Sequence, residues 1–209
     1  MKEFFVVTAL AITAVSPTPT PSPSPTPIPF WKAKTEIYER MKDRRYIAVS
    51  AKGEDDGDLK KLTVISAGII HAPEAFTHEL VLKFSEYPEY VPYIEETSYD
   101  ATTHNLFLHG AVLGYHEKMT LHIQDQEIPG GHQMQWTSIG EGFRGMTGTI
   151  DEKVVDGEHT EISMYGLYRG KSLGIPGFLL NWGLEFAAHR ASGSMRSHIE
   201  SEWEKAKKH

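Results

Sequence analysis

The sequence predicts an α+β fold in which a curved antiparallel sheet wraps around one long C-terminal helix. Between Tyr93 and Gly170, apolar and polar residues alternate with a period of two, which is typical of strands with one buried face. From Ile175 to about Lys205, apolar residues recur every three or four positions instead, as in an amphipathic helix. A sheet with one apolar face must be covered, and this helix is the only large cover that the sequence supplies.

A shorter amphipathic helix is expected at the start of the folded region. One face of it carries four apolar residues, Trp31, Ile37, Tyr38 and Met41. Two β-favouring runs follow at residues 46–50 and 62–70. The acidic, glycine-containing stretch at 53–58 between them is expected to be a loop.

A second helix is expected to begin at Pro73 and Glu74, because proline is tolerated in a first turn and a carboxylate complements the helix dipole. Three apolar residues follow at four-residue spacing, namely Phe76, Leu80 and Phe84. Prolines at 88 and 92 prevent a longer helix, so residues 85–92 are expected to form a short, turn-rich segment.

The alternating region divides into strands at its turn signals. In residues 115–123, Met119, Leu121 and Ile123 share one face. Three further strands are expected, at residues 134–138, 143–155 and 160–168. Pro-Gly-Gly at 129–131 and Asp-Gly at 156–157 are hairpin signals, so consecutive strands should form an antiparallel meander.

The N-terminus differs from the rest of the chain. Residues 1–16 are similar to a secretory signal, and their apolar run is shorter than the roughly 20 residues of a membrane span. Proline at every second position of residues 17–29 predicts an extended spacer. We therefore expect a folded domain at 30–206, exported to the periplasm or envelope, with the first segment cleaved or kept as a tether. A cytoplasmic location is the alternative, since Glu3 and Pro17 are poor signal features.

Composition excludes several classes of function. The 209 residues carry a formal net charge of −7, and no basic stripe is present, which argues against a nucleic-acid partner. The chain has no cysteine, so disulfides, thiolate metal sites and a thiol nucleophile are excluded. At 23% charged and 40% hydrophobic residues, the composition is that of a globular protein.

Several motifs resemble those of a known superfamily. The segments 71–76 (HAPEAF) and 87–92 (YPEYVP) resemble the paired proline motifs that open bacterial START-like domains. Residues 174–182 resemble the start of the START C-terminal helix, and residues 148–160 resemble the hairpin that precedes it. This is the lipid-transfer, polyketide-cyclase and coenzyme-Q-binding superfamily (SRPBCC) that includes birch-pollen allergen. The resemblance covers about residues 32–204 and implies a helix-grip fold with a central ligand cavity.

Two charged residues are expected on the same strand face as apolar neighbours. Glu117 is two positions from Met119, and Arg144 is two positions from Met146. A buried charge needs a partner, so each should contact a ligand, pair with the other, or lie near a strand end in water. START-like cavities often hold such a residue, and the resemblance therefore implies ligand contact.

The other candidate ligand-binding residues are aromatic or methionine side chains, for which core packing is an equal alternative. They are Tyr93, Phe107, Met119, Met134, Trp136, Met146, Met164, Tyr168, Trp182 and Phe186.

Catalytic and metal motifs are weak. The G-x-G-x-x-G match at 140–145 continues as a strand, which favours a glycine-rich turn and a bent strand over a dinucleotide site. His78-Glu79 begins an H-E-x-x-H pattern, but Leu82 occupies the second histidine position. The eleven histidines are best interpreted as surface residues. We therefore expect no catalytic residue, no metal and no cofactor.

The sequence thus predicts the binding or transfer of a hydrophobic small molecule, such as a lipid, a quinone or a sterol-like compound, without catalysis. The alternative is a cyclase, an aromatase or a hydrolase that acts on an aromatic or polyketide-like substrate in the same cavity. A module with a filled core is a third possibility. The chain is expected to be a monomer whose partners are a hydrophobic small molecule or lipid and, transiently, a membrane.

Overall fold

The computed structural model describes residues 29–112, 114–140, 143–171 and 177–208, and gives only the backbone for Arg44, Val112 and residues 177–181. The expected signal segment at 1–16 and residues 17–28 of the expected spacer lie outside the described residues, as do Ile175 and Pro176. The expectations for these segments stay predictions. No described helix is long and apolar enough to cross a membrane.

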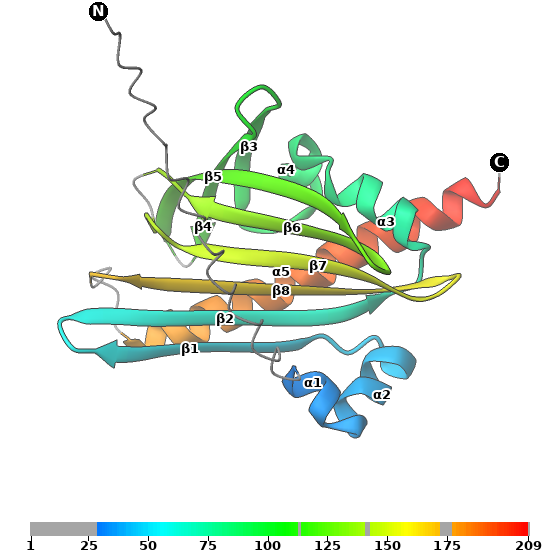
Figure 1. The fold of residues 1–209 in the computed structure, drawn as a ribbon, viewed down its shortest axis with the longest axis horizontal. Helices are drawn as coiled ribbons and strands as arrows, with labels where there is room; N and C mark the ends of the chain where they lie inside the picture. The colour runs from blue at the N-terminus through cyan, green and yellow to red at the C-terminus, as the bar shows by residue number, and fades with distance from the viewer. Residues whose placement is uncertain (1–28, 113, 141–142, 172–176, 209) are drawn as a thin grey trace, which may run out of the picture.

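One antiparallel sheet organises the molecule (Figure 1). Its eight strands are β1 (Ala48–Asp56), β2 (Leu59–Ile70), β3 (Ile94–Asp100), β4 (Asn105–Val112), β5 (Tyr115–Ile128), β6 (Gly131–Ser138), β7 (Thr147–Asp156) and β8 (His159–Gly170). Their order is β1-β2-β8-β7-β6-β5-β4-β3, so the N-terminal hairpin pairs with the last strand of a meander.

The helices lie around this sheet. They are α1 (Phe30–Ala33), α2 (Thr35–Arg44), α3 (Glu74–Val81), the 3-10 helix η1 (Phe84–Glu86), α4 (Tyr87–Tyr90) and α5 (Gly177–Ala206). The long helix α5 crosses behind the strands in Figure 1, while α3 and α4 lie near the β3–β6 half. This architecture confirms the predicted α+β fold, a curved antiparallel sheet around a C-terminal helix.

Several element boundaries differ from the sequence expectation, most clearly in three places. The acidic stretch at 53–58 is mostly strand, because Gly57, at φ 63°, allows β1 and β2 to turn within two residues. The strand expected at 143–155 begins only at Thr147, since residues 143–145 form a turn closed by a bond from Met146 N–H to the Phe143 carbonyl. Phe84 lies in η1, because α3 ends at Val81.

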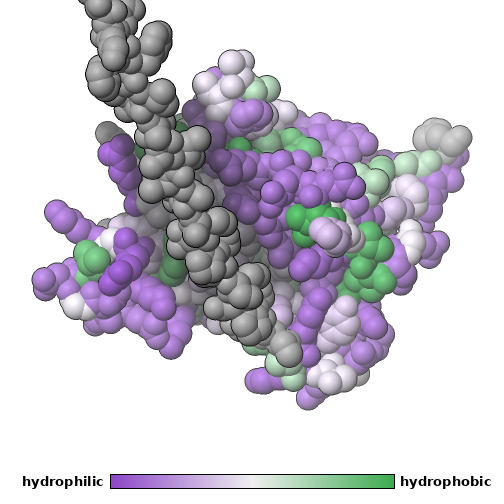
Figure 2. All heavy atoms as spheres, in the orientation of Figure 1, coloured by the Kyte–Doolittle hydropathy of each residue, from purple (hydrophilic) through white to green (hydrophobic). Residues whose placement is uncertain are grey.

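Helices α1 and α2 cover the outer face of the β1–β2 hairpin. Trp31, Met41 and Ile69 are buried there, and Ile37 and Tyr38 are half-buried. Elsewhere the part of the outer face that is visible in Figure 2, in the orientation of Figure 1, is largely hydrophilic. The opposite, inner face therefore carries the main core.

The side chain of Trp136 on β6 accounts for the presence of glycine at two positions of the inner face. Gly148 pairs with Trp136, and Gly166 pairs with Gly148, so the indole lies across positions without side chains. A Cβ added at Gly148 would lie 2.3 Å from the indole and 2.2 Å from the Tyr165 carbonyl oxygen. Such contacts require the strands or the indole to move.

Gly148→Ala is therefore expected to lower the free energy of unfolding by about 3 kcal/mol. Gly157→Ala is the matched control, because a Cβ at that turn position meets nothing within 4 Å. Urea denaturation of both variants measures the difference. Equal stability of the two variants would contradict this packing of Trp136.

Candidate functional site

The helix α5 packs unevenly against the sheet. Its backbone lies close to β1 and β2 and also contacts α3 and α4, whereas β5, β6 and β7 approach it less closely. Small residues permit the close approach of α5 to β1 and β2. Ser192 Oγ donates to Ser66 Oγ at 3.3 Å, and a Cβ on Gly193 would lie 3.5 Å from Ile47 Cδ1. The β4–β7 half of the inner face therefore reaches α5 through its side chains.

Six of the predicted ligand-binding residues share this inner face, on β5, β6 and β8 and at the position just before β7. They are Met119, Met134, Trp136, Met146, Met164 and Tyr168. We call them the inner wall. Met134, Trp136 and Tyr168 are buried, and the other three are half-buried. The inner wall thus combines a packed centre with adaptable methionines beside it.

Three further predicted residues form a row of rings at the N-terminal half of α5. Trp182 and Phe186 stack with centroids 5.7 Å apart, and Tyr93 lies 6.2 Å from Phe186. Trp182 is 59% exposed and Phe186 39% exposed. We call these three residues the aromatic row. Its exposed rings offer an apolar surface at one end of the grip.

The structure does not bring the remaining three predicted residues into the inner wall. Phe107 pairs with Thr120 and lies on the opposite face of β4 from the inward Leu106, so strand alternation places it outside. Glu117 shares the inward parity but lies near the start of β5 and is exposed. Arg144 is exposed in the turn at 143–145, just before β7 begins. Among the described residues no ion pair joins Glu117 to Arg144, and both lie near a strand end with access to water.

The far end of the inner face carries ionisable side chains. Along the β6–β7 pair, Trp136 faces Gly148, Met134 faces Ile150, and finally His132 faces Glu152. Together with Glu74 and His78 of α3 and Asp125 of β5, His132 and Glu152 form what we call the histidine–carboxylate cluster.

The cluster is built from two stacked imidazoles between three carboxylates. The rings of His78 and His132 are parallel, with centroids 3.7 Å apart. His78 Nδ1 lies 3.1 Å from Glu152 Oε2, and His78 Nε2 lies 3.3 Å from Asp125 Oδ2. His132 Nδ1 lies 2.6 Å from Glu74 Oε1. Each imidazole can therefore exchange a proton with a carboxylate.

Glu152 is the most perturbed member. It is 1% exposed, and burial raises the pKa of its carboxyl from 4.5 to about 8, with further increases from the charges of Glu74 and Asp125. Burial also raises the pKa of Tyr87, whose O–H donates to the Val81 carbonyl at 2.6 Å. The raised pKa favours the protonated carboxyl of Glu152, which can donate a hydrogen bond to His78.

Sequence reasoning missed this cluster, although a signal was present. His132 lies two positions from Met134 in β6, and Glu152 lies two positions from Ile150 in β7. Strand alternation alone therefore places both side chains on the inner face. The contribution of α3 could not be read in the same way, because it depends on how that helix docks on the sheet.

One group among the described residues could hold a metal ion. Glu95, His109 and His116 present ligand atoms within 4.8 Å of one another, on β3, β4 and β5. His109 Nδ1 lies 3.4 Å and His116 Nδ1 3.6 Å from Glu95 Oε2. All three are exposed or half-buried, and they lie outside the inner wall.

Comparisons with known proteins address the fold. No family profile matches the sequence, and no curated protein is significantly similar to it. Solved structures do match. Human STARD10 superposes with a TM-score of 0.57 at 8% identity, over 88% of this chain and 84% of that one.

Two bacterial structures are similar as well. The Zhui aromatase/cyclase from Streptomyces sp. R1128 has a TM-score of 0.55 at 16% identity, over 69% of this chain and 94% of that one. The STAR-related lipid transfer protein from Xanthomonas axonopodis has a TM-score of 0.54 at 12% identity, over 72% and 98%. The chain therefore has the helix-grip fold of these solved structures, which is the fold that its sequence motifs predict.

Proposed function

We propose that the protein binds a hydrophobic small molecule between the inner wall and α5, without catalysing its conversion. The observation that carries this proposal is the uneven packing of α5. The helix lies close to β1 and β2, while the methionine-rich inner wall faces it from the other part of the sheet. Similarity to a protein named for lipid transfer and to an aromatase/cyclase supports ligand binding by this fold.

Burial of apolar ligand surface would drive binding, at about 25 cal/mol per Å². Methionine side chains adapt to irregular and flexible ligands, which favours an acyl chain, an isoprenoid quinone or a sterol-like compound. The aromatic row would form the entrance, because its exposed rings lie at one end of the grip. A polar ligand end could contact Glu152 or His78 at the other end.

Met164→Trp tests this proposal. Met164 is half-buried on β8 and packs in the same cluster as Leu184 and Ala188 of α5, so an indole there would occupy ligand space. With the neutral fluorescent probe N-phenyl-1-naphthylamine, we expect the variant to bind at least about tenfold more weakly, which corresponds to about 1.4 kcal/mol.

Gln135→Trp is the matched control, since Gln135 is exposed on the outer face of β6. It is expected to bind the probe like the unmodified protein. Thermal unfolding verifies that both variants fold. The proposal fails if the unmodified protein binds no probe and gentle purification followed by mass spectrometry returns no lipid, or if both tryptophan variants bind equally.

A second candidate function is catalysis at the cluster end of the inner face. The observation that favours it is the contact of the buried Glu152 with the half-buried His78, 3.1 Å apart, which could act as general acid and base on an aromatic or polyketide-like substrate. The two candidates are separated by incubation with a poly-β-ketone substrate. Turnover that is lost in Glu152→Gln would establish the enzyme, whereas unchanged recovery of the substrate supports binding alone.

A further inference from the structure

A hollow of about 720 Å³ lies between α5, α4 and the segment that joins α2 to β1. Its floor on α5 is formed by small residues, among them Gly193, Ser194 and Ser197. Tyr46 and Tyr90 line its sides. None of the inner wall belongs to this lining, so the hollow is separate from the site described above.

The lining is strongly basic in an acidic chain. It contains four arginines, Arg40, Arg45, Arg190 and Arg196, together with His189 and a single carboxylate, Glu89. The whole chain carries a net charge of −7 with only 21 Lys and Arg residues. Such a concentration of like charge on one concave surface attracts anions.

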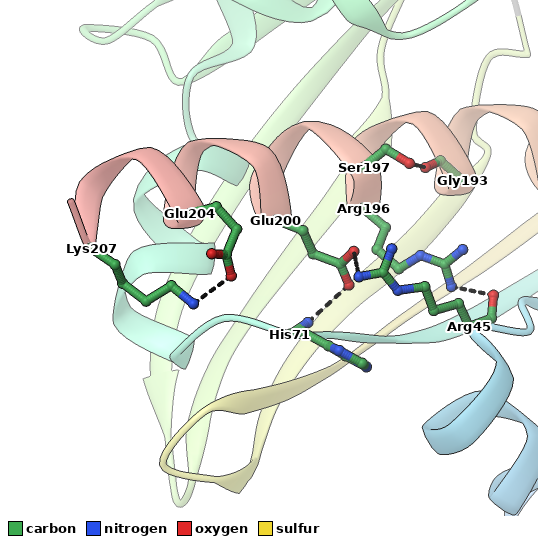
Figure 3. A network of polar contacts seen from close by, with 8 residues as sticks. All are labelled: Arg45, His71, Gly193, Arg196, Ser197, Glu200, Glu204 and Lys207. Carbon is green, nitrogen blue, oxygen red and sulfur yellow. Dashed lines mark hydrogen bonds and ion pairs between the residues drawn. The ribbon is translucent and has the colours of Figure 1, made fainter.

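Figure 3 shows how two of these guanidinium groups are held side by side. Arg196 Nη1 donates to the Arg45 carbonyl oxygen. Arg45 Nη2 lies 3.2 Å from Glu200 Oε2, and Glu200 Oε1 accepts a bond from the His71 N–H at 3.1 Å. Glu200 thus neutralises Arg45 and fixes it to the fold.

Within the described residues no ion pair engages Arg40, Arg190 or Arg196, and Arg40 lies over the ring of Tyr46, 4.3 Å from its centroid. Burial lowers the pKa of Arg196 from its ordinary value, the charge of Glu200 opposes this, and the charge of Arg45 adds to it. Partly desolvated like charges of this kind are stabilised when an anion binds between them.

We infer that this hollow binds a phosphate group carried by a larger molecule. Guanidinium groups form paired hydrogen bonds with phosphate oxygens, and several arginines around one concavity are typical of phosphate recognition. The volume exceeds that of a bare phosphate, and the two tyrosines offer contact to an attached organic group. The phosphate could belong to a lipid headgroup or to a soluble phosphate ester, and the inference does not depend on the proposed interior site.

The test compares two doubly substituted full-length chains. Arg40→Gln with Arg190→Gln removes two exposed charges from the hollow. Lys205→Gln with Lys207→Gln removes two exposed charges from the end of α5, outside the hollow. Both variants change the net charge equally. Calorimetric titration with phenyl phosphate is expected to show binding that weakens at least about tenfold in the arginine variant and less than about twofold in the lysine variant.

Vesicles of phosphatidylcholine, with and without phosphatidic acid, separate the two sources of phosphate. Binding of phenyl phosphate that the arginine variant loses, without co-sedimentation of the protein with the phosphatidic acid vesicles, indicates a soluble ester. Co-sedimentation that depends on phosphatidic acid and on the two arginines indicates a lipid headgroup. The inference is overturned if the unmodified protein binds neither probe, or if the two variants weaken equally, since that would reflect net charge alone.

Discussion

Between about pH 4.5 and pH 8 the free energy of unfolding is expected to fall by as much as about 5 kcal/mol, because of the carboxyl of Glu152. Its pKa is about 8 in the folded protein, against an ordinary value of 4.5. Since the folded state holds this proton more tightly, the stabilisation is complete below the unfolded pKa. It is lost as the pH rises through the folded pKa.

Glu152→Gln isolates this effect, because the amide resembles the protonated carboxyl in shape and can still donate a hydrogen bond to His78. We expect the variant and the unmodified protein to be equally stable near pH 4.5, and the variant to be more stable near pH 9. Urea denaturation at a series of pH values measures both curves. If the variant retained the slope of the unmodified protein, other groups would control the pH dependence.

The second large effect is a difference in stability between two tryptophan variants, one at a packed position and one at the proposed entrance. Trp136 is 9% exposed and lies over Gly148 and Gly166, so Trp136→Ala is expected to lower the free energy of unfolding by about 4 kcal/mol. Trp182 is 59% exposed in the aromatic row, and Trp182→Ala is expected to change stability by less than about 0.5 kcal/mol.

Trp182→Ala should nevertheless weaken ligand binding, although it leaves stability almost unchanged. Trp182→Ala removes a ring that stacks on Phe186 at the proposed entrance, and should weaken binding of N-phenyl-1-naphthylamine about fivefold. Denaturation and fluorescence titration of both proteins provide the measurements. Loss of stability on Trp182→Ala, with unchanged probe binding, would show that the aromatic row serves packing.

The fold was predictable because its signals are local and repeated. Alternation in residues 115–123 and 160–168, hairpin turns and one long amphipathic segment specify an antiparallel sheet and its covering helix without any knowledge of distant contacts. The sheet order was not specified in this way. The pairing of β2 with β8 follows from the curvature of the whole sheet, which no short segment encodes.

The candidate site was predictable only in its apolar part. Parity correctly placed Met134 and Trp136 inside, because both lie in the middle of a strand. Strand alternation gave the wrong environment for Glu117, since a residue near a strand end can reach water whichever face it lies on. For His78, the position of the side chain depends on the docking of α3 against β5 and β7, which is a tertiary property.

The pairing of β2 with β8 also has a consequence for the order of folding. Leu62 pairs with Tyr168 and Ile70 with Thr160, contacts that span about 100 residues and are slow to form. During synthesis, the β1–β2 hairpin therefore emerges long before its partner strand, and until then the β2 edge is unpaired as well as the β1 edge. Such an edge is a template for association with other chains. The nascent hairpin is consequently open to such association until β8 pairs with β2.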